Sequence, residues 1–130
     1  MNKPVKIAFF GSDEIALPCL QAMSNSLDIV EISAVLTQPD RRSGRGRTLQ
    51  SNAIKQWAIE SSLPIRDPQK PGIEEVTWLK ELGVDLILVM AYGHILKQAL
   101  LDSAPLGCFN LHASLLPKYR GASPIETSIA

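Results

Sequence analysis

The amino-acid sequence predicts an α/β fold, a doubly wound and mostly parallel sheet with helices on both faces. Two observations support this prediction. Short apolar, β-rich runs alternate with segments of helical periodicity along all 130 residues, and no linker or internal repeat divides the chain. Such alternation is typical of right-handed β-α-β crossovers, which place helices over both faces of one sheet. We therefore expect one domain.

The first strand is expected at residues 3–10, an apolar run that enters the tight turn Gly11-Ser12-Asp13. A capped turn there leads into a helix, because apolar residues recur at helical spacing. These residues are Ile15, Leu17, Leu20 and Met23. The second strand is expected at 31–36. The polar stretch 38–48, rich in glycine and arginine, predicts a loop.

The next unit begins at Ser51, which we expect to cap a helix that ends at Ser62. Residues 63–65 contain a proline, which favours a short edge strand. A helix is expected at about 72–82, and the strongly apolar run 85–91 predicts a central strand buried on both faces. That run is far shorter than the roughly 20 residues that cross a bilayer. The remaining elements are a short helix at 95–101 and a strand at 107–111.

Composition describes an ordinary globular protein, with 45% hydrophobic and 20% charged residues. Thirteen basic residues balance thirteen acidic ones, so a nucleic-acid partner must be met by a local patch. The two cysteines, Cys19 and Cys108, lack the spacing of metal ligands, and we expect no metal. No signal peptide is visible at the N-terminus. A reduced cytoplasmic location is expected, without a membrane or a protein partner.

The ends of the predicted strands are the expected place for a ligand, because parallel α/β folds bind ligands at the carboxyl ends of their strands. The segments at these ends are Gly11-Ser12, Thr37-Gln38, Ala91-Tyr92-Gly93 and His112-Ala113. We expect them to gather along one rim. Where the central strand ends, at Met90 to Gly93, unpaired backbone groups are expected to be available to a flat heterocycle.

Two simpler candidates are rejected. The first turn has one glycine in place of G-x-G-x-x-G, and Asp13 and Glu14 would repel a phosphate, so NAD binding is not expected. His94 has no polar partner at a suitable spacing. We expect it to be an exposed histidine at the start of a helix.

Four arginines fall within seven residues of the predicted loop, offset locally only by Asp40. They are Arg41, Arg42, Arg45 and Arg47. Arginine without lysine favours forked contacts to phosphates, and the loop starts at the ligand rim. Contact with phosphate or RNA is the favoured interpretation, and a merely solvated loop is the alternative.

Asn110 and His112 are the candidate catalytic residues. Two positions apart on a strand, they point the same way. An amide can donate to an oxygen that gains negative charge, and an imidazole can move a proton at neutral pH, which suits acyl transfer. A buried polar pair satisfied by backbone groups is the alternative.

The residues around this pair resemble the folate-dependent formyltransferases, and most closely the members that act on methionyl-tRNA. The resemblance spans nearly the whole chain. It is carried by the stretch from Phe109 to Pro117, its continuation Arg120-Gly121-Ala122-Ser123-Pro124-Ile125, Thr37-Gln38-Pro39-Asp40-Arg41 with the Arg/Gly segment 44–47, and Ala91-Tyr92-Gly93. The Arg/Gly segment distinguishes the tRNA-acting members from those that act on glycinamide ribotide or amino sugars.

The resemblance implies a Rossmann-like formyltransferase fold and transfer of the formyl group of 10-formyltetrahydrofolate to the amine of methionyl initiator tRNA. Asn110 and His112 would be catalytic, and the four arginines would bind the tRNA. The folate site would be lined by Met90, Ala91, Tyr92, Ser114, Leu115, Leu116 and Pro117. Whether His112 acts as a base or as a charged donor is open.

One departure from the family is expected to matter. A catalytic Asp and a C-terminal RNA-binding domain lie beyond the equivalent of residue 130 in the family. We therefore expect residues 1–130 to be a truncated N-terminal catalytic domain with little or no activity alone, whose sheet exposes an edge after the strand at 107–111. The alternatives are a formyltetrahydrofolate hydrolase, an amino-sugar formyltransferase, or a noncatalytic folate- or RNA-binding remnant.

Overall fold

The computed structural model describes residues 3–43, 46, 48–113 and 125–129. Its main feature is a twisted sheet of six strands, in which the first five are parallel and the last is antiparallel. In spatial order the strands are β5 (Ile65–Arg66), β2 (Val30–Leu36), β1 (Val5–Phe10), β6 (Leu86–Val89), β7 (Cys108–Ala113) and β8 (Ile125–Ile129). The predicted fold class is confirmed.

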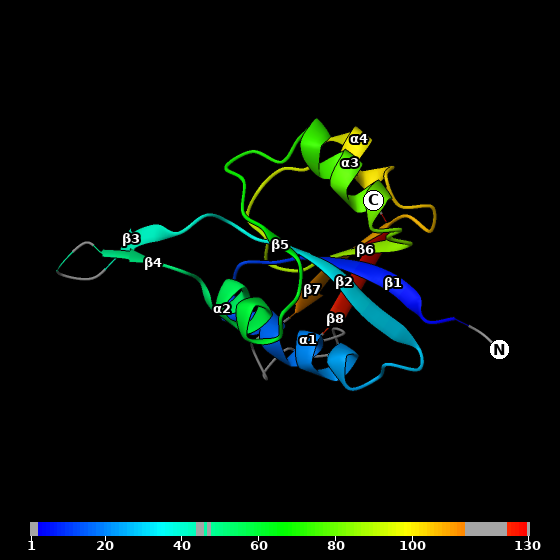
Figure 1. Cartoon of the computed structure of the whole chain (residues 1–130), viewed down its shortest axis with the longest axis horizontal. Helices are drawn as coiled ribbons and strands as arrows, with labels where there is room; N and C mark the ends of the chain where they lie inside the picture. Colours follow the sequence, from blue (N-terminus) through cyan, green and yellow to red (C-terminus); the bar gives the residue numbers. More distant parts are fainter. Residues whose placement is uncertain (1–2, 44–45, 47, 114–124, 130) are drawn as a thin grey trace.

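Helices cover both faces of this sheet, as Figure 1 shows. One face carries α1 (Leu17–Ser24), preceded by the 3-10 turn η1 (Glu14–Ala16), and α2 (Ala53–Glu60). The other face carries α3 (Ile73–Glu81) and α4 (Gln98–Leu101). Within the part of the chain that the structure describes, no helix is long and apolar enough to cross a membrane.

Alternation along β1 builds the two hydrophobic cores. Phe9 is fully buried among residues of α1 and α2, whereas its neighbour Phe10 is fully buried among residues of α3 and α4. A strand flanked by helices on both faces needs apolar side chains at every position, which explains the continuous apolar run of the sequence. Burial of two phenylalanines at successive positions fixes the register of the central strand.

The stretch predicted as a loop at 38–48 contains part of a β-hairpin instead. Strand β3 (Arg41–Ser43) pairs antiparallel with β4 (Thr48–Gln50), and Figure 1 shows the hairpin projecting from the body of the domain. The prediction was wrong there because arginine and glycine carry little strand propensity. Pairing between Arg41 and Gln50 depends on the chain turning back on itself.

Two helix boundaries also differ from those predicted. Asn52, not Ser51, caps α2, because the Asn52 Oδ1 accepts a hydrogen bond from the Lys55 amide at 2.8 Å. The Ser51 hydroxyl donates to Asp40 instead. The helix expected at 95–101 is confined to α4, so residues 95–97 are extended or irregular.

Strand β8 was not predicted. It lies beside β7, so that β7 is an inner strand and not the exposed edge expected from the sequence. Residues Ile125–Ile129 carry an isoleucine at each end and three polar residues between them, so the sequence shows no regular alternation that would have predicted this strand. The strand predicted at 107–111, observed as β7, is thereby paired with a neighbouring strand on each side.

Candidate active site

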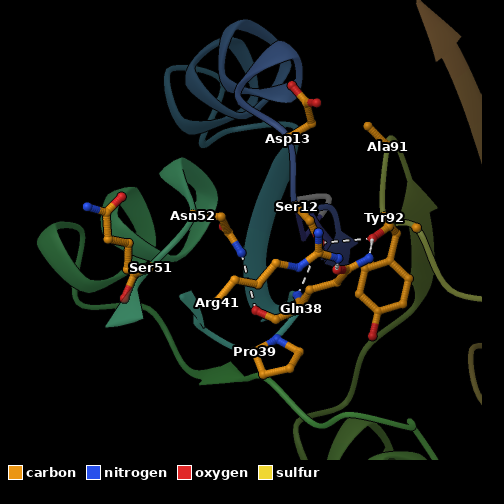
Figure 2. Close-up of a pocket in the computed structure, with 11 residues that line it drawn as sticks. Ser12, Asp13, Gln38, Pro39, Arg41, Ser51, Asn52, Ala91 and Tyr92 are labelled. Carbon is orange, nitrogen blue, oxygen red and sulfur yellow. Dashed lines mark hydrogen bonds between the residues drawn. The ribbon is translucent and has the colours of Figure 1, made fainter. Parts of the chain in front are cut away.

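A pocket of about 540 Å³ opens where the central strands end. Figure 2 shows its walls, which come from four segments far apart in the sequence. These are Ser12-Asp13, Gln38-Pro39 with Arg41, Gln50-Ser51-Asn52, and Ala91-Tyr92-Gly93. The volume falls in the range of small-molecule sites, roughly 300–1,000 Å³. Three of the four predicted rim segments therefore meet at one cavity.

Ser12 ties these segments together. Its hydroxyl donates to the Tyr92 carbonyl at 2.9 Å and accepts a hydrogen bond from the Gln38 amide at 3.1 Å. Its own amide donates to the Ala91 carbonyl at 2.9 Å. A hydroxyl suits this position because it can donate and accept at once. The three strand ends are thus cross-linked at the floor of the pocket.

Gly11 allows the first turn to approach the neighbouring strand end. A Cβ at this position would lie 2.8 Å from the Met90 carbonyl oxygen and 2.7 Å from the Phe9 ring. A real Cβ does not approach other atoms so closely, so the single glycine of this turn is needed for close packing against Phe9 and Met90. Asp13, two residues later, caps η1 by accepting a hydrogen bond from the Ile15 amide at 3.0 Å, which confirms the predicted capped turn.

The segment Met90–Gly93 presents only part of itself to the pocket. Met90 and Tyr92 are buried, whereas Ala91 and Gly93 are exposed. The Tyr92 ring packs against Phe10, with a centroid separation of 5.8 Å. Burial, with a smaller contribution from the charge of Glu75, raises the pKa of the Tyr92 hydroxyl well above its usual range. Tyr92 is therefore a core side chain that contributes its backbone to the rim.

The backbone of this segment is less open than the sequence suggested. The Met90 amide donates to Phe10, the Ala91 carbonyl accepts from Ser12, and the Tyr92 carbonyl accepts two side-chain hydrogen bonds. The backbone amides of Ala91 and Tyr92, by contrast, donate to no acceptor among the described residues. Ala91 also has a φ of 54°, a left-handed conformation that is rare without glycine. Within the described part of the chain, these two amides are therefore donors without an acceptor.

Arg41 is the predicted tRNA-binding residue that the structure places at the pocket. Its guanidinium donates to the Gln38 side-chain oxygen, and Figure 2 shows it reaching toward Ser12 and Tyr92. Arg42, the next residue of β3, is exposed and does not line the pocket. Arg45 and Arg47 lie outside the described residues.

The base of the hairpin is fixed by an ion-pair cluster that the sequence did not reveal. The Lys55 ammonium lies 2.9 Å from Asp40 and 2.8 Å from Asp67. The two carboxylates, Asp67 foremost, raise the pKa of Lys55, and the hydrogen bond from Lys55 lowers the pKa of Asp40. Asp40, the acidic residue next to the arginine stretch, is thus engaged with Lys55 of α2 and with Ser51.

The candidate catalytic residues lie on β7, two strands from β1 in the sheet. Asn110 is half-buried and pairs in register with Val89, the last residue of β6. The strand continues unbroken through His112, whose backbone pairs with Glu126 of β8. This register carries the strand past the end of β6, toward the level of Ala91. The His112 side chain and residues Ser114, Leu115, Leu116 and Pro117 lie outside the described part.

His94 is not the exposed helix-start residue predicted from the sequence. It lies in a bend before α4 and is half-buried, with its ring edge-on to Tyr92 at a centroid separation of 5.2 Å. Its Nε2 and the Tyr92 hydroxyl are buried without a hydrogen-bond partner among the described residues. The error arose because packing against Tyr92 depends on the turn at Gly93, which sequence spacing does not show.

Replacing Gly93 tests how closely the backbone of the turn packs against the Gln38 side chain. It has a φ of 94°, and a Cβ there would collide with the Gln38 side-chain nitrogen. Gly107 has the same φ of 94° with nothing within 4 Å. Gly93→Ala and Gly107→Ala should each destabilise the fold by about 1 kcal/mol through backbone strain. Only Gly93→Ala should add a further loss, measured by urea denaturation; equal losses would contradict the close packing of Gly93 on Gln38.

Comparison with known proteins agrees with this architecture. A family model described as Formyl transferase matches residues 5–130. A methionyl-tRNA formyltransferase of Legionella pneumophila (strain Paris) is 47% identical over 124 residues, which are 95% of this chain and 39% of the relative. A methionyl-tRNA formyltransferase of Clostridioides difficile (strain 630) is 45% identical over 94% of this chain and 39% of the relative. The chain thus spans about two fifths of the length of these relatives.

Solved structures match the fold. Phosphoribosylglycinamide formyltransferase from Bacillus halodurans superposes with a TM-score of 0.62 at 20% identity, covering 89% of this chain and 60% of that one. Formyltetrahydrofolate deformylase from Burkholderia mallei gives a TM-score of 0.57 at 18% identity, covering 95% of this chain and 42% of the deformylase. At such identities the likeness concerns the fold alone. On the family match and the sequence identities together, the chain belongs to the formyl transferase family.

Proposed function

We propose that this chain provides the formyl-transfer site of an enzyme that moves a formyl group from 10-formyltetrahydrofolate to the amine of methionyl initiator tRNA. One observation supports this most directly. A single pocket is lined by Arg41, from the arginine-rich hairpin, and by the turn at Ala91–Gly93, the proposed folate segment. A transferase needs both substrates at one place, and the names of the relatives indicate methionyl-tRNA as the acceptor.

The folate side of the site is proposed at the end of β6. Exposed Ala91 and Gly93 leave room for a flat ring, and the amides of Ala91 and Tyr92 can donate to its acceptor atoms. Met90 would support the segment from the core, and Ser114, Leu115, Leu116 and Pro117 would contribute the other wall. When bound, 10-formyltetrahydrofolate supplies an activated formyl group; the protein residues orient it.

The catalytic roles follow from chemistry. We propose that the Asn110 amide donates to the formyl oxygen as negative charge develops there, which favours the transition state over the ground state. His112 would accept the proton that the attacking amine must lose and pass it toward the folate nitrogen. Holding both reactants beside one strand end reduces the entropic cost of their meeting.

The acceptor side is proposed along the hairpin. Arg41, Arg42, Arg45 and Arg47 would contact phosphates near the acceptor end of the tRNA, and Arg41 would do so beside the pocket. We also propose that residues 1–130 form the N-terminal part of a catalytic domain. An acid that orients His112 and an RNA-binding domain would come from outside these residues, and the protein would act in the reducing cytoplasm, where Cys19 and Cys108 remain free.

The proposal is tested on the complete gene product with labelled 10-formyltetrahydrofolate and methionyl-tRNA. Formyl transfer that requires the charged tRNA is the expected result. Release of formate without any tRNA would instead support a formyltetrahydrofolate hydrolase. Transfer to an amino sugar would support an amino-sugar formyltransferase. Binding without turnover would indicate a noncatalytic remnant.

Replacing Arg45 tests the hairpin. Arg45→Ala should raise KM for methionyl-tRNA several-fold and leave kcat nearly unchanged. Because one phosphate contact is lost, the slope of log binding constant against log salt concentration should become shallower by about one. Lys70→Ala removes an exposed cation elsewhere and serves as the control. If Arg45→Ala and wild type have the same KM at moderate salt and the same salt slope, the arginine stretch is a solvated segment that does not bind tRNA.

A further inference from the structure

We infer that Gln38 is a positioning residue that holds the guanidinium of Arg41, with its charge intact, against the turn at Ala91–Gly93. The inference rests on the proposed function, in which Arg41 meets a tRNA phosphate and the turn meets the folate. Gln38 would thereby fix the spacing between the two substrate sites. Sequence reasoning placed Gln38 at the rim but gave it no role.

The backbone of Gln38 is anchored on both sides. Its amide donates to the Ser12 hydroxyl at 3.1 Å, and its carbonyl accepts from the Asn52 side-chain nitrogen at 3.2 Å. Only 8% of the residue is exposed. Asn52 is itself the N-cap of α2, so Gln38 is tied to the first turn and to a helix at once. The side chain therefore starts from a fixed point.

The side chain spans the gap between the hairpin and the turn. Its Nε2 donates to the Tyr92 carbonyl at 2.8 Å, and its Oε1 accepts from the Arg41 guanidinium (Figure 2). One end must donate and the other must accept, which a primary amide does and a carboxylate cannot. Glycine at position 93 leaves room for this amide, since a Cβ at Gly93 would collide with Nε2.

The choice of an amide also preserves charge. The other cation at the base of the hairpin, Lys55, is paired with two carboxylates, whereas no carboxylate among the described residues forms an ion pair with Arg41. Asp13, the acidic residue that lines the same pocket, caps η1. A neutral partner orients the guanidinium without cancelling its field, so that its charge remains available to a phosphate.

Two substitutions separate these contributions. Gln38→Glu keeps an acceptor for Arg41, adds a neutralising charge and removes the donor to Tyr92. Gln38→Met keeps the length of the side chain and removes both hydrogen bonds. The matched controls are Gln21→Glu and Gln21→Met, on the exposed surface of α1 away from the pocket. They correct for the net charge and for the change of side chain.

We expect Gln38→Glu to raise KM for methionyl-tRNA about tenfold and to lower the log–log salt slope of tRNA binding by about one, as if a phosphate contact were lost. Gln38→Met should lower kcat/KM about tenfold to one hundredfold, because two buried hydrogen bonds are lost. It should raise KM for the folate as well as for the tRNA, since the turn loses its support. The assays are steady-state formylation and filter binding of tRNA between 50 and 200 mM salt, a range over which phosphate contacts are resolved.

The outcomes distinguish the inference from the proposed function. Wild-type formylation with unchanged KM and salt slope in both Gln38 variants would overturn the positioning role and leave the function standing. Failure of the wild type to formylate would overturn the function, and the salt slope of Gln38→Glu would still decide whether Gln38 preserves the charge of Arg41. No tRNA binding by the wild type would overturn both. If Gln38→Met proves unfolded by circular dichroism, Gln38→Glu decides alone.

Discussion

Asn110→Ala is expected to lower kcat for formyl transfer about one hundred to one thousand fold, the usual loss when a donor to a developing oxyanion is removed. Asn110 is half-buried on β7 and its backbone is in register with Val89, the last residue of β6, from which the chain leads into the turn that we propose for the folate. KM for methionyl-tRNA should remain within about twofold, since the interaction is made in the transition state.

Steady-state kinetics and filter binding of tRNA measure this difference. Asn25→Ala, the same change at an exposed position that ends α1, is the control and should behave as wild type. Asn110→Ala with near-wild-type turnover would sink the proposed role of the amide. A fall in tRNA affinity equal to the fall in kcat/KM would indicate that Asn110 contributes to binding and not to the chemical step.

His112→Ala is expected to lower kcat by about one hundred to ten thousand fold, the range associated with loss of a general acid or base. The residue follows Asn110 by two positions on an unbroken strand, which is the condition for the two to share one face. If His112 accepts the proton as a neutral imidazole, wild-type kcat/KM should fall on the acid side of neutrality, because a protonated imidazole cannot accept a proton.

The pH profile distinguishes the role of His112 from that of the methionyl amine, which also titrates. In His112→Ala the acid limb that belongs to the imidazole should disappear, and any limb that persists belongs to the substrate. A wild-type rate that rises as pH falls through the same range would show instead that the charged imidazole donates to the formyl oxygen. Turnover in His112→Ala equal to that of the wild type would contradict both roles.

Periodicity identified most of the sheet because burial on both faces requires continuous apolar runs. The runs in β1, β2 and β6 have this form, and their placement was predicted to within a few residues. Boundaries decided by hydrogen bonds were less predictable. Ser51 and Asn52 are both good caps in isolation, and the choice between them depends on Asp40, which lies eleven positions before Ser51 in the chain and engages its hydroxyl.

Residue types alone were enough to propose candidate site residues, whereas the roles that depend on contacts between distant residues could not be proposed from the sequence. The Asn110/His112 strand and the arginine cluster were visible as patterns. The roles of Ser12, Gln38 and Lys55 were not, because common polar residues become informative only when the fold gives each of them partners distant in sequence. Tyr92 shows the reverse case: a promising rim residue whose side chain belongs to the core.

By itself, the sequence determined the α/β class, the five parallel strands in their order along the chain, and the reaction chemistry expected from Asn110 and His112. These depend on local periodicity and on the intrinsic properties of side chains. The sequence predicted that Gln38 and the turn at Ala91–Gly93 lie at one rim, but only the tertiary structure decided that the Gln38 side chain meets both Arg41 and this turn at one pocket. That meeting is produced by parallel strand pairing, which brings together residues more than fifty positions apart and has no signature in any single stretch of sequence.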